Sequence, residues 1–243
     1  MPDRLDFSCR AQLAEEIDGP CSFEDLRDCL RDLAVVNRIV LTHRPIFAWL
    51  QRVATSPAVR QLNRPLRIVD VGCGYGDMLR RLERWAAARQ LSVDLIGIDI
   101  NANGLRSARE ATPPASRIRW LPGDAITHPE TAHSDIILAS GMTHHLTEPE
   151  LIALLQWMER AADIGWMICD LHRKPVPYHC FDISFRGPWW HRFIRPDGLR
   201  SIRRSFLEED WERICAAANL APGAAQIRAY RPARLCVERV KQP

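Results

Sequence analysis

The chain has 243 residues, of which 47% are hydrophobic and 26% are charged, and its formal net charge at pH 7 is +3. These values are ordinary for a folded globular protein with a substantial core, and they lie outside the range of disordered chains. So small a net charge does not indicate nucleic acid or anionic lipid as a partner.

The eight cysteines are scattered along the chain, and they include no C-x-x-C pair and no Cys/His spacing typical of a zinc site. A chain of this length does not need disulfides for its stability, so scattered thiols favour a reducing compartment. The first residues lack the apolar core of a signal peptide, and no apolar run reaches the length of a membrane span. We therefore expect a cytoplasmic protein without a membrane span.

Residues 1–62 predict a helical cap. Ser22 is followed three residues later by Asp25, which is a capping pattern for the start of a helix. Apolar residues then recur at helical spacing as far as Val40, and a second helical piece covers residues 46–53. We expect this cap to precede a core domain over residues 63–243.

From Leu66 the sequence alternates between short apolar runs and amphipathic helices. Strands are predicted over residues 68–71, 93–100, 118–121, 135–140, 166–170, 226–230 and 235–240, and helices over residues 77–89, 147–162 and 207–220. Such alternation implies an α/β fold in which helices cover both faces of a mostly parallel sheet. We predict a Rossmann-like, doubly wound sheet of seven strands.

A glycine-rich turn follows the first predicted strand and reads D-x-G-x-G-x-G from Asp70 to Gly76. Gly72, Gly74 and Gly76 can adopt backbone angles closed to other residues, and they let the chain approach a ligand closely. A dinucleotide-binding loop spaces its glycines as G-x-G-x-x-G and cradles a pyrophosphate. Here the last gap is one residue, and Asp70 and Asp77 flank the glycines. An acidic rim repels phosphate but suits the ammonium and sulfonium charges of S-adenosylmethionine (SAM).

Two more carboxylates follow the next predicted strands. Asp99, with Ile100 behind it, ends the second strand, where such sheets bind ligands and where a carboxylate can accept hydrogen bonds from both ribose hydroxyls. Asp124, followed by Ala125, comes just past the third strand and can accept a hydrogen bond from an adenine amino group. Each carboxylate alone could be a turn residue or a helix cap, but the ordered set favours a nucleoside site.

With these motifs, residues 35–240 resemble the class I SAM-dependent methyltransferases, and in particular the small-molecule branch that includes quinone-biosynthesis enzymes. The resemblance implies that SAM, and its product S-adenosylhomocysteine (SAH), contact nine residues: Asp70, Gly72, Gly74, Gly76, Asp99, Ile100, Asp124, Ala125 and Ser140. It places the glycine turn around the methionine moiety, the second strand end at the ribose, the third at the adenine, and Ser140 beneath the sulfonium.

Two histidines, His144 and His145, follow the fourth predicted strand. A phenol has a pKa near 10, so its ionisation at pH 7 costs about 4 kcal/mol, part of which a positioned base recovers. We interpret His145, slightly ahead of His144, as the general base, and Asp170 at the end of the fifth strand as the carboxylate that orients it. The arrangement resembles some sugar and phenol O-methyltransferases. In the alternative interpretation the histidines only cap or pack the next helix, and Asp170 is a solvated acid.

The sequence gives little support for two related chemistries. A metal-dependent O-methyltransferase needs a carboxylate cluster, and Asp170 has no Asp-Asn partner beside it, so we expect no metal. The Asn-Pro-Pro-Tyr-type segment that grips nucleobase amines is replaced by Ser140-Gly-Met-Thr. This argues against methylation of adenine N6.

Residues 171–206 form an insert that is longer than a loop requires and rich in aromatic side chains. We expect a lid over the sheet edge that suits a flat or lipophilic acceptor. The alternative is a helix that packs its aromatics on the core. Arginines interleave with the aromatics, a pattern that can bind single-stranded RNA, but the modest net charge favours a solvated face or an anionic small acceptor.

The sequence thus predicts O-methylation of a phenolic, quinol or polyketide-like small molecule by a monomer or homodimer, with nucleic acid not expected as a partner. The alternatives are C- or N-methylation of a similar metabolite, methylation of RNA, and a SAM-binding regulatory protein without turnover. A nicotinamide-dependent dehydrogenase is the least favoured interpretation.

Overall fold

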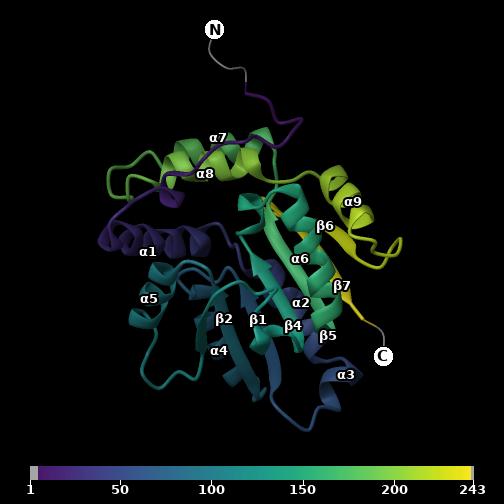
Figure 1. Cartoon of the computed structure of the whole chain (residues 1–243). Helices are drawn as coiled ribbons and strands as arrows, with labels where there is room; N and C mark the ends of the chain where they lie inside the picture. Colours follow the sequence, from purple (N-terminus) through teal and green to yellow (C-terminus); the bar gives the residue numbers. More distant parts are fainter. Residues whose placement is uncertain (1–4, 242–243) are drawn as a thin grey trace.

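The computed structural model describes residues 5–241, and a seven-stranded sheet runs through its centre (Figure 1). The strands are β1 (Leu66–Val71), β2 (Val93–Asp99), β3 (Arg119–Pro122), β4 (Ser134–Ser140), β5 (Ala162–Leu171), β6 (Gln226–Tyr230) and β7 (Arg234–Val240). Their order is β3-β2-β1-β4-β5-β7-β6. The first five strands in this order pair in parallel, and β7 is antiparallel to both of its neighbours. The predicted Rossmann-like, mostly parallel sheet of seven strands is confirmed.

Helices cover both faces of the sheet, as a doubly wound fold requires. The described α-helices are α1 (Phe23–Ile39), α2 (Arg44–Ala54), α3 (Pro57–Arg60), α4 (Asp77–Ala87), α5 (Ala102–Glu110), α6 (Glu148–Ala161), α7 (Pro175–Ser184), α8 (Ile194–Arg204) and α9 (Glu208–Ala217). Figure 1 shows α6 in front of the sheet with α9 to its right, and α2 and α4 on the other side. Leu155 and Trp211 are buried in the front layer, and Trp49 and Leu82 are buried in the back layer.

Helix α2 belongs to the core and not only to a cap. Its Ile46, Trp49, Leu50 and Val53 are almost fully buried in the same cluster as Ile68 of β1. Full burial of a large aliphatic side chain contributes about 1.5–3 kcal/mol, so this helix stabilises the back face of the sheet substantially. The division of the chain at residue 62 stays a prediction.

Two predicted helix starts are confirmed by their caps. The Ser22 hydroxyl accepts a hydrogen bond from the Asp25 amide at 3.1 Å at the start of α1. Thr147 and Glu150 form a capping box at the start of α6, the helix predicted from residue 147. These side chains satisfy amide groups that the first turn of a helix leaves without a backbone partner.

Strand β5 begins at Ala162, four residues before the predicted start at Trp166. Ala162 and Ile164 are buried, whereas Asp163 between them is exposed. At the start of the strand, buried and exposed side chains therefore alternate, as they do where only one face of a sheet is covered. The exposed Asp163 interrupts the continuous apolar run that is typical of a fully buried strand. Helix α6 ends at Ala161, so strand follows helix without a loop.

The insert folds as helices α7 and α8, which lie over the carboxyl edge of the sheet together with α1 (Figure 1). Phe185 and Phe193 are buried against Cys29 and Val36 of α1, whereas Trp189 is 75% exposed. Part of the aromatic set thus joins the insert to the N-terminal helix instead of packing on the sheet. Within residues 5–241, no helix combines the length and the apolar character that a membrane crossing needs.

Candidate active site

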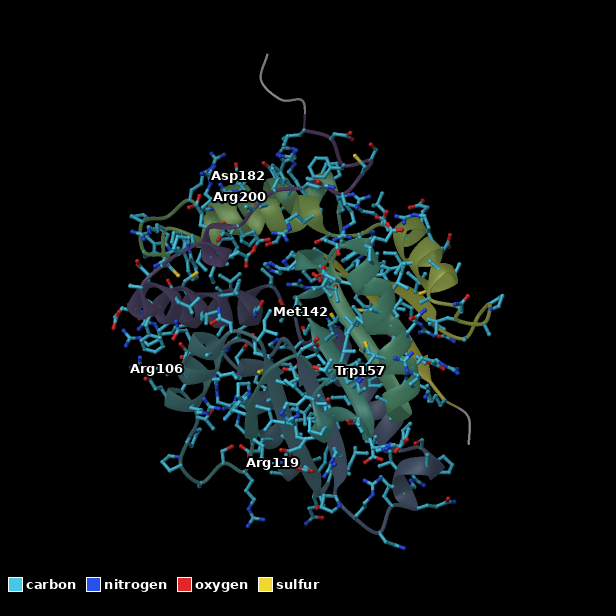
Figure 2. The ribbon with its side chains drawn as sticks, in the orientation of Figure 1. Arg106, Arg119, Met142, Trp157, Asp182 and Arg200 are labelled. Carbon is cyan, nitrogen blue, oxygen red and sulfur yellow. The ribbon has the colours of Figure 1, made fainter. Side chains whose placement is uncertain are left out.

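A cavity of about 1210 Å³ lies between the carboxyl edge of the sheet and the cover made by α1, α7 and α8. Pockets for one small molecule typically measure about 300–1,000 Å³, so this cavity has room for a cofactor and an acceptor together. Figure 2 shows Met142 at this edge, below the cover in which Asp182 and Arg200 are labelled. The cavity lies where parallel α/β sheets bind their ligands.

The predicted glycine turn has the backbone that only glycine adopts readily. Gly72, Gly74 and Gly76 have φ angles of 64°, 47° and 70°, in the left-handed region. Gly72 and Gly74 line the cavity, but Gly76 does not. A Cβ built on Gly76 would lie 2.2 Å from the ring of Trp120. The structure therefore places Gly76 against a neighbouring side chain, where close packing requires the glycine.

Replacing Gly76 by alanine is expected to lower the free energy of unfolding by about 2–4 kcal/mol, because the new methyl group both strains the backbone and meets Trp120. Urea denaturation measures this change. Gly223→Ala is the matched control, since Gly223 also has a positive φ of 75° but has open space around its Cβ position. Equal destabilisation by the two substitutions would contradict the packing role of Gly76.

Asp99 ends β2 and fixes the turn above it. One carboxylate oxygen accepts a hydrogen bond from the Gly74 amide at 2.7 Å, and the other accepts one from the Asn101 amide at 2.8 Å. Burial raises the pKa of Asp99, against the lowering effect of these two hydrogen bonds. Ile100 beside it lines the cavity and is 82% exposed. An exposed apolar side chain next to a carboxylate provides a surface for a flat base beside a ribose.

Asp70 is buried at the end of β1 and also lines the cavity. Burial, followed by the charges of Asp77 and Asp99, raises the pKa of Asp70 well above its usual range. Three carboxyl groups close together in a part-buried site repel one another, and a cation among them relieves that repulsion. This half of the cavity therefore favours a positively charged ligand and disfavours a phosphate.

The remaining predicted cofactor residues also lie at the cavity. Asp124 lines it, and one of its carboxylate oxygens accepts a hydrogen bond from the Ile126 amide at 2.9 Å. Ala125 is buried behind it, and Ser140 lines the cavity at the end of β4. Asp124 thus serves as a turn residue in this structure while its side chain remains at the cavity.

The two predicted histidines form a single 3₁₀ turn, Thr143–His145, directly after β4. His144 Nδ1 lies 2.8 Å from an oxygen of Asp170, and the other Asp170 oxygen accepts hydrogen bonds from the Thr143 hydroxyl and the His144 amide. Burial alone would raise the pKa of Asp170, but the His144 ring and the hydrogen bonds hold it well below the usual range. Asp170 is therefore an ionised acceptor, not a solvated strand-end acid. It lies beneath His144, away from the cavity lining.

His145 turns toward the N-terminal segment. Its Nδ1 lies 3.0 Å from a carboxylate oxygen of Asp18. Burial lowers the pKa of His145, but the hydrogen bond with Asp18 and the charge of Glu15 outweigh burial, so the pKa is raised above 6.5. Both histidines line the cavity, so the structure brings them together with the cofactor residues at one edge.

Sequence reasoning missed Glu15 and Asp18, which the N-terminal segment brings to the histidines. Glu15 is buried, and its two carboxylate oxygens lie 3.6 Å from His144 Nε2 and 3.8 Å from His145 Nε2. The segment is held in place by Asp197 of α8, which accepts hydrogen bonds from two of its backbone amides. The acidic run at residues 15–18 was the available signal, but its place depends on contacts with α8 that no local pattern reveals.

One donor set in the site has the composition of a metal centre. Nitrogen atoms of His144 and His145 and an oxygen of Glu15 all lie within 4.8 Å of one another. The guanidinium of Arg204 already pairs with Glu15, with an N–O distance of 3.3 Å. A positive charge bound to the carboxylate weakens the attraction of the set for a cation.

Comparison with known proteins identifies the core. Residues 68–165 match the family described as "Methyltransferase domain". The matched residues run from β1 into β5, so this part of the sheet is similar to that family. Trans-aconitate 2-methyltransferase of Azoarcus sp. (strain BH72) is 35% identical over 138 residues, which are 56% of this chain and 49% of that protein. Indolepyruvate C-methyltransferase of Streptomyces griseus is 35% identical over 95 residues, which are 36% of this chain and 26% of that protein. The chain thus spans about half or less of the length of these curated relatives.

Solved structures agree with the assignment of the methyltransferase domain at the level of the fold. A SAM-dependent methyltransferase from Aquifex aeolicus has a TM-score of 0.59 at 16% identity, covering 90% of this chain and 98% of that one. The plantazolicin methyltransferase BpumL, solved with SAH, has a TM-score of 0.58 at 16% identity, with coverage of 91% and 98%. The fold predicted from resemblance, that of the class I SAM-dependent methyltransferases, is confirmed.

Proposed function

We propose that the methyltransferase domain binds SAM and transfers its methyl group to a hydroxyl oxygen of an aromatic or lipophilic small molecule, with His144 as the general base. The observation that carries this proposal is that one cavity joins an acidic, glycine-lined half to a histidine that a buried carboxylate orients. The first half suits a cationic nucleoside, and the second suits removal of a hydroxyl proton.

The chemistry needs few groups. A lone pair of the acceptor oxygen forms a bond to the methyl carbon, and the carbon–sulfur bond breaks, so that its electron pair stays on the sulfur of SAH. The hydroxyl proton moves to Nε2 of His144. Asp170 holds the Nδ1 hydrogen of this ring and stabilises the imidazolium that results. We favour His144 over His145 because its carboxylate partner is fully buried and fixed, whereas Asp18 is half exposed.

The arginines of the insert do not favour RNA as the acceptor. Arg186 and Arg195 pair with Asp182, and Arg192 pairs with Asp25. Arginines that are already paired with carboxylates offer less free positive charge to a phosphate backbone. C-methylation, which the name of one relative describes, remains the second candidate because the same base can remove a proton from an acidic carbon.

The proposal is tested by incubating the protein with SAM labelled in its methyl group and a panel of phenols, quinols and polyketide-like hydroxy compounds. The expected result is label in an O-methyl group of an extracted product, identified by mass spectrometry and NMR. Label attached to carbon would replace the proposal by C-methylation. Binding of SAM without transfer to any compound in the panel would favour the non-catalytic alternative.

The pH dependence of the rate is expected to show an acidic limb set by His145. The pKa of His145 is raised above 6.5, so this ring stays protonated to a higher pH than usual. Its positive charge then lies beside His144 and opposes the uptake of a proton by that base. Activity is therefore lost as the pH falls through this raised value. Because Asp18 raises the pKa, Asp18→Asn should move the limb to lower pH, whereas the exposed Asp163→Asn should not. A limb that stays in place in Asp18→Asn would contradict this account.

A further inference from the structure

Three groups that accept hydrogen bonds converge on the cavity: Glu15 and, at a pH where both rings are neutral, Nε2 of His144 and Nε2 of His145. His144 Nδ1 and His145 Nδ1 each face a carboxylate, which only accepts, so in the neutral rings the hydrogen sits on Nδ1 and Nε2 carries a lone pair. Both Nε2 atoms face Glu15 at 3.6 and 3.8 Å, distances too long for a hydrogen bond. Arg204 reaches one Glu15 oxygen and leaves the other for a ligand.

A bound molecule with hydroxyl groups could donate hydrogen bonds to these acceptors. Glu15 and His144 are largely buried and line the cavity, so a ligand that displaces solvent from them must supply the donors that water would supply. A single hydroxyl can serve one of the two Nε2 atoms or the free Glu15 oxygen, whereas two adjacent hydroxyls can serve both sides of the set. The three acceptors all line the cavity, so they meet the acceptor molecule and not the protein interior.

The charges around the cavity restrict the acceptor further. Its lining includes eight acidic residues, Glu15, Asp18, Asp70, Asp77, Asp99, Asp124, Glu150 and Asp197. Among the described lining residues, Arg234 is the one arginine or lysine, and its guanidinium is buried and donates to the Thr42 hydroxyl. Burial, with the charges of Arg81 and Arg234, lowers the pKa of His43 to about 4, so this histidine is neutral. An acceptor that carries carboxylates would find repulsion here and no free counter-ion.

We propose that Glu15, His144 and His145 form a clamp for an acceptor with two adjacent hydroxyl groups on an apolar body, such as a catechol, and that the clamp excludes carboxylate-bearing acceptors. The inference rests on the proposed function, because one of the two hydroxyls is the one that His144 deprotonates. The other hydroxyl donates to the free oxygen of Glu15 or to His145 Nε2. The acceptor therefore differs in charge from the trans-aconitate that the names of several relatives describe.

The clamp is tested by comparing three compounds, 4-butylcatechol, 4-butylphenol and trans-aconitate, as acceptors. We expect kcat/KM for 4-butylcatechol to exceed that for 4-butylphenol by about tenfold or more, as the loss of a hydrogen bond to a charged group implies. Trans-aconitate should give no turnover above background. In Glu15→Gln the preference for the catechol should fall to about threefold or less, whereas Glu16→Gln, one residue along the same segment and exposed, should keep it.

Several outcomes would overturn the clamp. They are equal use of catechol and phenol, no use of either, turnover of trans-aconitate, or an unchanged preference in Glu15→Gln. The assays are repeated after dialysis against EDTA. Loss of the catechol preference after chelation would also contradict the clamp, because it would indicate that the diol binds a metal ion held by the same three residues. SAH binding by calorimetry and transfer of the labelled methyl group to oxygen across the panel together separate the two failures. Failure of the clamp leaves both intact, whereas failure of the proposed function removes at least one of them.

Discussion

Replacement of Asp99 by alanine is expected to weaken the binding of SAM and SAH by about 100-fold or more. The carboxylate is proposed to accept hydrogen bonds from both ribose hydroxyls, and charge-assisted hydrogen bonds contribute about 1.5–3 kcal/mol each. The same side chain holds the Gly74 amide at 2.7 Å, so its loss also releases the turn that lines the cavity. Isothermal titration calorimetry with SAH measures the change.

Two further variants make this result specific. Asp99→Asn keeps an oxygen for the Gly74 amide but removes the charge and the acceptor for the Asn101 amide, so its loss of affinity reports on the ribose contact with the Gly74 hydrogen bond retained. Asp163→Asn, an exposed aspartate at the start of β5, should bind SAH as the unmodified protein does. Undiminished SAH affinity in Asp99→Ala would contradict the proposed contact between Asp99 and the ribose.

Replacement of His144 by alanine is expected to lower kcat by about 100- to 10,000-fold, the usual contribution of a positioned general base. SAH affinity should not change, because the base acts on the acceptor and not on the cofactor. Asp170→Asn should also lower kcat, since an amide does not fix the hydrogen on His144 Nδ1 as a carboxylate does. Single-turnover kinetics with an acceptor that the unmodified protein methylates, together with SAH titration, separate the two effects.

His133→Ala serves as the control for loss of a histidine, because His133 is exposed and does not line the cavity. His145→Ala should reduce kcat less than His144→Ala and should move the acidic limb of the pH profile to lower pH, because the charge of His145 beside the base is lost. A larger loss of kcat in His145→Ala than in His144→Ala would identify His145 as the base, the residue that the sequence alone slightly favoured. Wild-type rates in both variants would reject a histidine base altogether.

The fold could be predicted from the sequence because its signals are local. The apolar runs of β1 and β4 and the helix caps at Ser22 and Thr147 each depend on a few neighbouring residues. The glycine turn was visible for the same reason, since a positive φ at Gly72 and Gly74 restricts the residue type directly. Strand β5 was misjudged at its start because Asp163 interrupts the apolar pattern.

The site was only partly predictable because half of it is assembled by tertiary contacts. His144 and His145 follow β4 and Asp170 lies at the end of the neighbouring β5, so the topology of a parallel sheet places them at one edge. Glu15 reaches them from a segment about 130 positions away in the chain, held by α8. The separation of Gly76 from the cavity depends on the ring of Trp120 from β3, which no motif spacing encodes.

The nucleotide preference of the cavity is the quantity on which this account depends most directly. Titration of the unmodified protein with SAH and with NADH in the same buffer, followed by calorimetry, measures it. The acidic groups around the glycine turn predict saturable binding of SAH at one site per chain and no detectable binding of NADH, whose diphosphate they repel. Tight binding of NADH with no binding of SAH would contradict the assignment of this cavity to a cationic nucleoside.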